Sequence, residues 1–313
     1  MKIIITFFLL LSITVSSQNI KMAFPEILKE FPQVRDFAMT TNQDEIYFTV
    51  DSYKKEYSYI AFIKKVNNQW SQPAVASFSG MYKDLEPFLS PNGLKLFFAS
   101  NRINNTAKES KKDIDIWYVE RVSLASKWSE PKNVGAIINT SANEYYPSVT
   151  AKGDLFFTAE YKNSKGKEDI YVSRFVNGMY TKPVSLSAGV NTEKYEFNAF
   201  VAPDESFIIF TSYGRKDDLG GGDLYISYKD QNNNWTTAKS LGKDINSHKI
   251  DYCPFVDIKT NTLYFTSEKT TLKKSFPTQK NIEELKQILK FEPNGLGRLY
   301  SVDISTILER KKD

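Results

Sequence analysis

Leu96-Phe97-Phe98-Ala99-Ser100 is one copy of a short apolar phrase that recurs along this chain. The phrase returns at residues 155–159, 208–212 and 263–267, and a weaker first copy occupies residues 46–50. Each copy lies within a longer repeat of about 50–60 residues, a period typical of repeat arrays and propellers. An apolar run without alternation indicates a strand that neighbouring sheets cover on both faces.

Each repeat contains four strand-like parts. The first is an acidic and aromatic segment that ends in a tight turn, as in residues 84–93, and the apolar phrase is the second. The third is of the Asp-Ile-Tyr type, as in residues 169–173, and the fourth is of the Trp-Ser-x-Pro type, as in residues 128–131. Because proline has no N–H to donate, its place in the fourth part predicts a sheet edge. Four strands that end at an edge are the blade of a β-propeller.

The number of blades follows from how often each of the four parts occurs. The second and third parts occur five times, but the fourth follows them only four times. Met22-Ala23-Phe24-Pro25 matches the missing copy, so we expect the N-terminal segment to supply the outer strand of the last blade. The sequence therefore predicts an all-β fold, a single five-bladed β-propeller of four-stranded antiparallel blades. A sixth blade is the alternative, if the divergent stretch 268–297 contains one.

That stretch interrupts the fifth blade between its second and third strands. Residues 281–290 have a helical pattern, in which Asn281 caps the first turn and Glu284 lies three residues on. The apolar residues of this segment share one face of the predicted helix. Either this short inserted helix covers a groove or binds a partner, or it packs its apolar face on blade five.

Composition and charge narrow the class of protein. The chain has 313 residues, of which 41% are hydrophobic and 25% are charged, which is ordinary for a globular protein. The net charge is only +4, and basic and acidic residues are interspersed, so nucleic acid is not an expected partner. Cys253 is the single cysteine, which excludes an intrachain disulfide.

The N-terminus has the pattern of a secretory signal peptide over residues 1–17. Lys2 is followed by an apolar stretch from Ile3 to Val15 and by the small residues Ser16 and Ser17. We expect residues 18–313 to form the exported propeller, either periplasmic or secreted. The cleavage site has no cysteine, so a lipoprotein anchor is not expected. No other long apolar run is present, so we expect no transmembrane segment after cleavage.

The repeat resembles the WD40-like propeller repeat called PD40, which occurs in TolB-type propellers of exported bacterial proteins. The resemblance is carried by the Pro-Asn-Gly and Pro-Asp-Glu turns, the Leu-Phe-Phe-Ala-Ser strand with Asn101-Arg102, and Gly220-Gly221-Gly222-Asp223-Leu224-Tyr225. It covers about residues 22–303. The resemblance implies a binding platform in the cell envelope, although the chain lacks the additional domains that TolB and peptidoglycan-binding members carry.

The sharpest candidate site is a set of acids at one repeat position: Asp84, Glu144, Glu196 and Asp251. Rotation about the propeller axis relates equivalent positions, so these carboxylates are predicted to form a ring near one end of the central channel. Such a ring could bind a hard cation such as Ca²⁺ or a basic peptide. Alternatively, each acid caps the turn of its own blade by accepting backbone N–H bonds.

The sequence contains few residues that could form a known catalytic site. His248 is the only histidine and no Gly-x-Ser-x-Gly motif is present, which leaves a Ser-His-Asp triad without support. We therefore predict a non-enzymatic module with no catalytic residue. We also expect no cofactor, and the alternative is Ca²⁺ bound at the ring of four acids. The expected partner is a protein or peptide, with a glycan second. The alternative function is a carbohydrate-active hydrolase that uses two axial carboxylates as acid and base or nucleophile.

Overall fold

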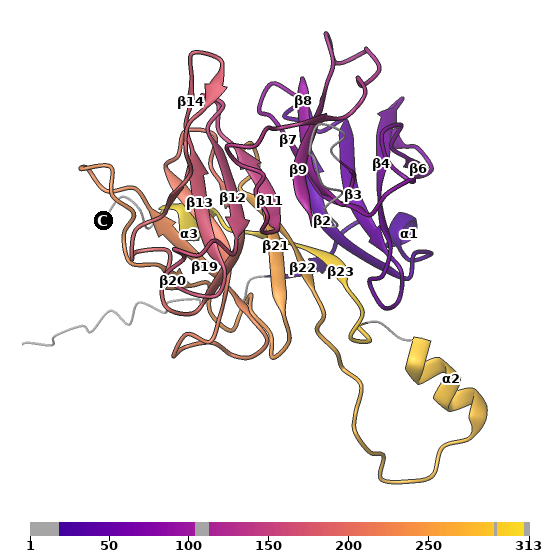
Figure 1. Cartoon of the computed structure of the whole chain (residues 1–313). Coiled ribbons are helices and arrows are strands. Elements are labelled where there is room, and N and C mark those ends of the chain that lie inside the picture. The colour runs from indigo at the N-terminus through magenta and orange to yellow at the C-terminus, as the bar shows by residue number, and fades with distance from the viewer. Residues whose placement is uncertain (1–18, 104–112, 291–292, 310–313) are drawn as a thin grey trace, which may run out of the picture.

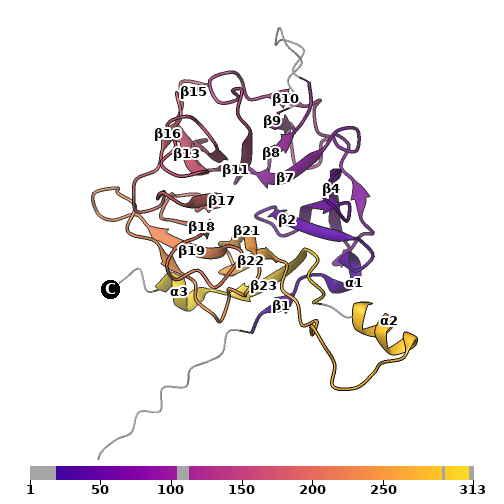
Figure 2. The same ribbon diagram turned by 60° about the horizontal axis from the view of Figure 1, so that its bottom comes forward.

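A ring of five β-sheets makes up the protein. The computed structural model describes residues 19–103, 113–290 and 293–309. The five main sheets lie as blades around a central axis, and Figure 2 shows this ring. The innermost strand of each blade contacts the innermost strands of both neighbouring blades. The predicted all-β, five-bladed β-propeller is confirmed, and the six-bladed alternative is wrong.

Each blade runs outward from a strand at the axis to a short edge strand (Figure 1). In this order, blade one contains β2 (Gln33–Met39), β3 (Glu45–Asp51), β4 (Ser58–Val66) and β6 (Ala74–Val75). Blade two contains β7 (Asp84–Leu89), β8 (Lys95–Ser100), β9 (Asp115–Glu120) and β10 (Lys132–Asn133). Blade three contains β11 (Glu144–Val149), β12 (Leu155–Ala159), β13 (Asp169–Ser173) and β16 (Val184–Ser185). Blade four contains β17 (Tyr195–Val201), β18 (Phe207–Tyr213), β19 (Asp223–Tyr228) and β20 (Lys239–Ser240). Blade five contains β21 (Asp251–Asp257), β22 (Thr262–Ser267), β23 (Arg298–Asp303) and β1 (Lys21–Met22). Three further short strands are present. In blade one, β5 (Gln69–Trp70) pairs with β4, and after β13 of blade three, β14 (Phe175–Val176) and β15 (Met179–Tyr180) form a separate hairpin.

The N-terminal segment closes the ring, as predicted. Strand β1 pairs antiparallel with β23, so that Met22 lies opposite Tyr300. The next residue continues the pairing, because Ala23 N–H donates to the Leu299 carbonyl at 2.9 Å. Helix α1 (Pro25–Leu28) then leads into β2 of blade one. Blade five is therefore built from both ends of the described chain, which leaves no unpaired terminal blade.

The edge strands begin later than the sequence pattern indicates. Strands β6, β10 and β16 start directly after Pro73, Pro131 and Pro183 and do not contain them. Proline cannot donate to the ladder, so pairing starts with the first residue that can. The predicted sheet edge is correct, but its position is shifted by a few residues along the chain.

The core lies in the seams between blades, where the apolar phrase of one blade packs on the next. Phe98 and Tyr47 fill the seam between blades one and two, and Phe156 and Phe210 fill the seam between blades three and four. Each of these side chains is at most 1% exposed. Burying one such aromatic side chain stabilises the fold by roughly 2–3 kcal/mol.

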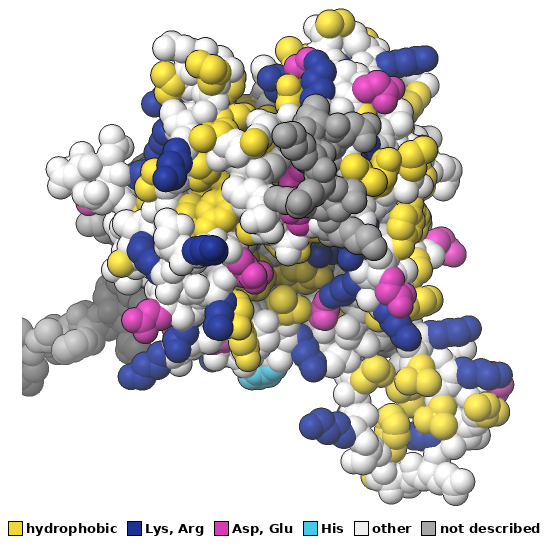
Figure 3. All heavy atoms as spheres, in the orientation of Figure 1, with side chains coloured by type: hydrophobic (Ala, Val, Ile, Leu, Met, Phe, Trp, Pro, Cys, Tyr) yellow, Lys and Arg dark blue, Asp and Glu magenta, His cyan; other side chains and the backbone are white. Residues whose placement is uncertain are grey.

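The insertion forms the predicted helix, but this helix does not pack on blade five. Helix α2 (Ile282–Lys290) has the expected capping box, in which Asn281 Oδ1 accepts from Glu284 N–H at 3.0 Å. None of its side chains is buried, and Ile282 and Leu289 are each 64% exposed. Figure 1 shows α2 standing away from the blades, and Figure 3 shows its hydrophobic side chains at the surface. The remaining helix, α3 (Ser305–Glu309), follows β23.

Candidate functional site

Every innermost strand carries one residue in the left-handed backbone region, at the same repeat position. The pairing register of each inner strand shifts at this point, which identifies a β-bulge. The φ angles run from 47° to 61°, although none of these residues is glycine. We call the five residues the axial ring: Asp36, Glu86, Tyr146, Asn198 and Cys253.

The axial ring brings together blades that are not neighbours. Tyr146 Oη of blade three donates to the Pro254 carbonyl of blade five at 3.0 Å. Asn198 Nδ2 of blade four lies 3.4 Å from Glu86 Oε1 of blade two. Contacts across the ring require these residues to face the propeller axis, so the bulges point these five residues into the central channel.

Glu86 is the centre of this network. Its Oε1 accepts from Arg35 Nη2 at 2.8 Å, and its Oε2 accepts from Tyr146 N–H at 2.7 Å. Arg35 Nε also donates to Asp36 Oδ1 at 3.0 Å, while Asp36 Oδ2 accepts from Glu86 N–H at 3.0 Å. One guanidinium therefore binds both carboxylates of the axial ring.

The axial ring is closed to solvent. Asp36 is 1% exposed, Glu86 4% and Cys253 0%. Burial raises the pKa of Glu86, and the Arg35 guanidinium acts in the opposite direction by lowering it. Burial also raises the pKa of the Cys253 thiol well above its ordinary value, so this thiol stays protonated and is a poor nucleophile. The arrangement suits a structural tie between blades better than a reaction centre.

The four acids predicted from the repeat lie elsewhere, at the start of the innermost strands. All four side chains are fully buried: Asp84, Glu144, Glu196 and Asp251. Glu196 accepts from Thr192 N–H at 2.8 Å, from Ser212 Oγ at 3.0 Å and from Arg215 Nη2 at 3.0 Å. These donors belong to the strands and loops of blade four.

The other three acids repeat this pattern of local bonds. Asp84 accepts from Ser100 Oγ at 2.6 Å and from Arg102 Nη2 at 2.9 Å. Glu144 accepts from Thr140 Oγ1 at 2.8 Å. Asp251 accepts from Ser247 N–H at 2.5 Å. Glu144, Glu196 and Asp251 accept from a backbone N–H four residues before them, as expected of turn caps, whereas the donors given for Asp84 are side chains. Within the described ranges, no three His, Cys, Asp or Glu side chains lie close enough to hold a metal ion. Ligand binding by the four acids stays a prediction.

The axial ring itself could not be recognised from the residue types. Its members stand two positions after the repeated acids, where each blade has a different side chain. The signal in the sequence is that the side chain at this position varies between blades while the rest of the repeat is similar. Three of the five, Glu86, Tyr146 and Cys253, directly precede a proline in the innermost strand.

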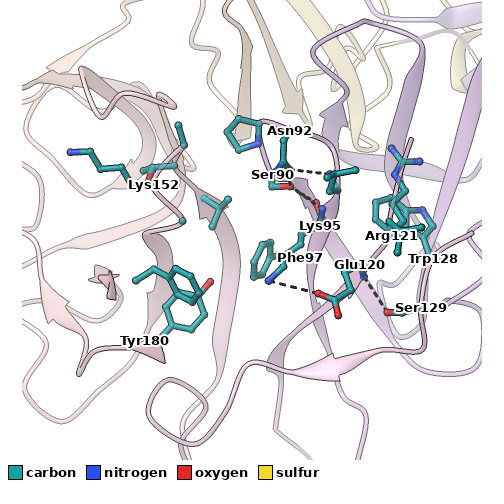
Figure 4. A pocket seen from close by; sticks show the side chains of 18 of the residues that line it. Ser90, Asn92, Lys95, Phe97, Glu120, Arg121, Trp128, Ser129, Lys152 and Tyr180 are labelled. Atoms are coloured by element: carbon teal, nitrogen blue, oxygen red, sulfur yellow. Dashed lines mark hydrogen bonds and ion pairs between the residues drawn. The ribbon is translucent and has the colours of Figure 1, made fainter. Parts of the chain in front are cut away.

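An open groove between blades two and three is the second candidate site. It has a volume of about 1000 Å³ and is lined by the turns and hairpins of both blades. Phe97 and Val149 form its apolar floor, and Phe175 and Tyr180 form one wall. Figure 4 shows Tyr180 and Lys152 on one side of the groove, with Phe97 and Trp128 across from them. We call this feature the blade 2–3 groove.

The residue at one repeat position differs beside the opening. In blade two, Trp128 fills the seam toward blade one, where its Nε1 donates to Tyr47 Oη at 2.9 Å. In blade four, Trp235 is 7% exposed in the seam toward blade three. Blade three has Tyr180 at this repeat position, and it is only half-buried. A phenol ring is smaller than an indole, so Tyr180 fills less of the seam between blades two and three than a tryptophan would.

The charges around the groove are mostly positive. Glu120 is neutralised by Lys132 at 2.5 Å and lies 3.8 Å from Lys95. Two further lysines at the groove, Lys127 and Lys152, form no ion pair with any residue that the structure describes. The groove therefore combines an aromatic and aliphatic interior with two lysines that form no ion pair within the described part of the chain.

Comparison with known proteins supports the fold and leaves the function open. No protein-family model matches this sequence, and no curated protein sequence matches it significantly. Many solved structures resemble it. The α-L-arabinofuranosidase from Podospora anserina, solved with cellotriose, has a TM-score of 0.51 at 10% identity, over 87% of this chain and 90% of that chain.

Two further solved structures match with TM-scores below 0.5. TolB from Acinetobacter baumannii matches with a TM-score of 0.48 and 12% identity, over 86% of this chain and 54% of that chain. The endo-arabinase from Bacteroides thetaiotaomicron matches with a TM-score of 0.47 and 16% identity, over 75% of this chain and 89% of that chain. The neighbours thus include both TolB proteins and glycoside hydrolases, and at these identities they bear on the fold alone.

Proposed function

We propose that this protein is an exported, non-enzymatic binding module that holds a segment of a protein partner in the blade 2–3 groove. The observation that carries the proposal is the unfilled seam itself. An open cavity with an aromatic interior and a few polar groups at its rim is the usual form of a binding site. Here Tyr180 lines the cavity at the repeat position where blades two and four have a tryptophan.

The alternative function, glycoside hydrolysis, has less support from the axial ring. A hydrolase needs two carboxyl groups that flank an accessible bond. Asp36 and Glu86 are the two acids of the axial ring, but they are 1% and 4% exposed. Both are also bound by Arg35 at 2.8–3.0 Å. A sugar would have to displace this guanidinium before it reached either carboxylate.

The exported location rests on the sequence. The predicted signal peptide, residues 1–17, lies outside the described residues. In the described part of the chain, no helix is long and apolar enough to cross a bilayer. We propose a periplasmic or secreted module, in keeping with the resemblance of its repeat to PD40 repeats of exported proteins.

Filling the groove tests the proposal. The variant Tyr180→Trp should restore the plug that blades two and four contain. The matched control is Tyr53→Trp, since Tyr53 is 70% exposed on another blade. Tagged wild-type protein and both variants are used to capture partners from an envelope extract, and the captured protein is then purified and titrated by calorimetry.

We expect Tyr180→Trp to weaken binding of the purified partner by about tenfold or more, with Tyr53→Trp unchanged. Equal affinities for wild type and Tyr180→Trp would show that the groove is not the binding site. Thermal melting of the variants separates loss of binding from loss of folding.

A further inference from the structure

We infer that the segment seated in the blade 2–3 groove is an extended, acidic peptide that carries an aromatic or large aliphatic side chain. This inference rests on the proposed function, because it names the chemistry of the partner for the same groove. Three observations carry it: the interior of the groove, its length and its charge.

The interior requires an apolar side chain. The apolar surface that a ligand can reach lies on the wall, where Phe175 is 37% exposed and Tyr180 is half-buried. Phe97 and Val149 at the floor are each only 3% exposed. The Tyr180 hydroxyl makes no hydrogen bond with any described residue, so it is available to a ligand or to water. Beside the groove, the β14–β15 hairpin also exposes Met179 to 70%. A ligand that was polar throughout would leave this apolar surface without a partner.

The groove continues beyond its main cavity. A second hollow of about 530 Å³ shares Lys95, Phe97, Phe175 and Tyr180 with it and runs on to Met179. The two hollows form one elongated depression, from the turns of blades two and three past the β14–β15 hairpin. An extended chain fits this shape, because its alternate side chains can enter the successive hollows.

The charge selects an acidic partner. Arg121 at the groove is neutralised by Glu45 at 2.9 Å, and Glu120 is neutralised by Lys132. Lys127 and Lys152 form no ion pair among the described residues, and Lys152 also borders a neighbouring hollow that Asp204 and Glu205 line. Carboxylates on the peptide would pair with these two lysines. Complementary charge across an interface favours the correct partner and repels basic ones.

Selection from a random peptide library displayed on phage tests the inference directly. The library is selected on wild-type protein after depletion on Tyr180→Trp, so that only groove-dependent peptides are kept. Enriched peptides are synthesised with a fluorescent label and titrated by anisotropy. The charge variant is Lys127→Glu/Lys152→Glu. Its matched control is Lys243→Glu/Lys249→Glu, which reverses two exposed lysines on other loops.

We expect the enriched peptides to contain Asp or Glu beside Phe, Tyr, Trp or Leu. Their affinity should fall by about tenfold or more in Lys127→Glu/Lys152→Glu and stay unchanged in the control. The affinity should also fall as salt is raised, because the charges at the rim are exposed to solvent.

Other outcomes overturn the inference and show what has failed. Groove-dependent peptides that are neutral or basic would remove the acidic partner and leave the groove as a binding site. A dimer of the protein in solution that Tyr180→Trp abolishes would make a second copy the occupant. If no peptide is enriched but capture of the natural partner still depends on Tyr180, the inference alone fails. If that dependence is also lost, the proposed function fails with it.

Discussion

Arg35 Nη2 donates a 2.8 Å hydrogen bond to Glu86 Oε1, and this contact joins blades one and two at the propeller axis. The same guanidinium lies 3.4 Å from Cys253 Sγ of blade five. Glu86 in turn accepts from blade three through Tyr146 N–H and meets blade four at Asn198. The pair therefore ties all five blades together at the one place where they converge.

Removing one member of this pair should be costly. Glu86→Ala leaves the Arg35 charge, which is 14% exposed, without its partner from blade two. We expect a loss of about 3 kcal/mol in the free energy of unfolding. Asp36 still pairs with Arg35, but one guanidinium N–H and the Tyr146 N–H lose their buried acceptor. The measurement is thermal or urea unfolding, where a loss of this size lowers Tm by several degrees. The exposed Glu193→Ala is the control and should change the stability by less than about 0.5 kcal/mol. Equal stability of both variants would contradict a structural role for the axial ring.

Stability should fall as the pH rises from weakly acidic to weakly basic. Burial raises the pKa of Glu144 to about 8, against 4.5 for an ordinary glutamate. A group with a raised pKa in the folded state contributes stability that is complete below 4.5 and is lost as the pH rises through 8. Each such group can change the free energy of unfolding by at most about 1.4 kcal/mol per pH unit. We expect wild-type protein to be less stable at high pH in urea titrations across this window.

Glu144→Gln should reduce that pH dependence. The glutamine carbonyl can still accept from Thr140 Oγ1, which donates to Glu144 at 2.8 Å, but it does not titrate. Burial raises the pKa of Asp251 to about 6 as well, so part of the slope should remain in the variant. A variant with the same slope as wild type between pH 6 and 8 would show that Glu144 is not the group responsible.

The protein should not hydrolyse arabinosides. Aryl arabinofuranosides are the simplest probes, because the solved neighbours include an arabinofuranosidase of similar length. We expect the rate with wild-type protein to equal that with Glu86→Gln, since neither Glu86 nor Asp36 is accessible. Turnover by wild-type protein that disappears in Glu86→Gln would instead establish the axial carboxylates as catalytic and end the binding-module proposal.

Closure of the ring should depend on Phe24. Its ring lies 5.7 Å from that of Trp70 in blade one and 6.4 Å from that of Tyr264 in blade five. Phe24→Ala removes the aromatic contact at the point where the N-terminal strand joins these blades. We expect a loss of about 2–3 kcal/mol, measured by urea unfolding, since the side chain is partly buried. Tyr53→Ala is the exposed control, and a similar loss in both variants would argue against this role in closure.

The sequence predicts this closure because every blade repeats one hydrophobic pattern and one copy of the fourth strand is displaced to the front. Met22 does lie opposite Tyr300, as that displacement requires. The axial ring was not predictable in the same way, because a β-bulge fixes its backbone while the side chains differ from Asp36 to Cys253. The groove is an intermediate case. Tyr180 stands out from Trp128 and Trp235 in the sequence, but only the packing of neighbouring blades shows that a groove lies beside it.

The arm that carries α2 should be dispensable for folding. Backbone bonds join the outgoing and returning segments at the base of the arm, and the bond from Thr271 N–H to the Pro293 carbonyl at 3.0 Å is one of them. Beyond that base, α2 buries no side chain. Replacing residues 273–292 with a short Gly-Ser linker should therefore leave Tm within about 2 °C of the wild-type value, because little packing is removed. A large fall in Tm would mean that the arm packs on the propeller in solution. If folding is retained, the same variant in the partner-capture experiment shows whether Ile282 and Leu289, the most exposed apolar residues of α2, contribute to binding in addition to the groove.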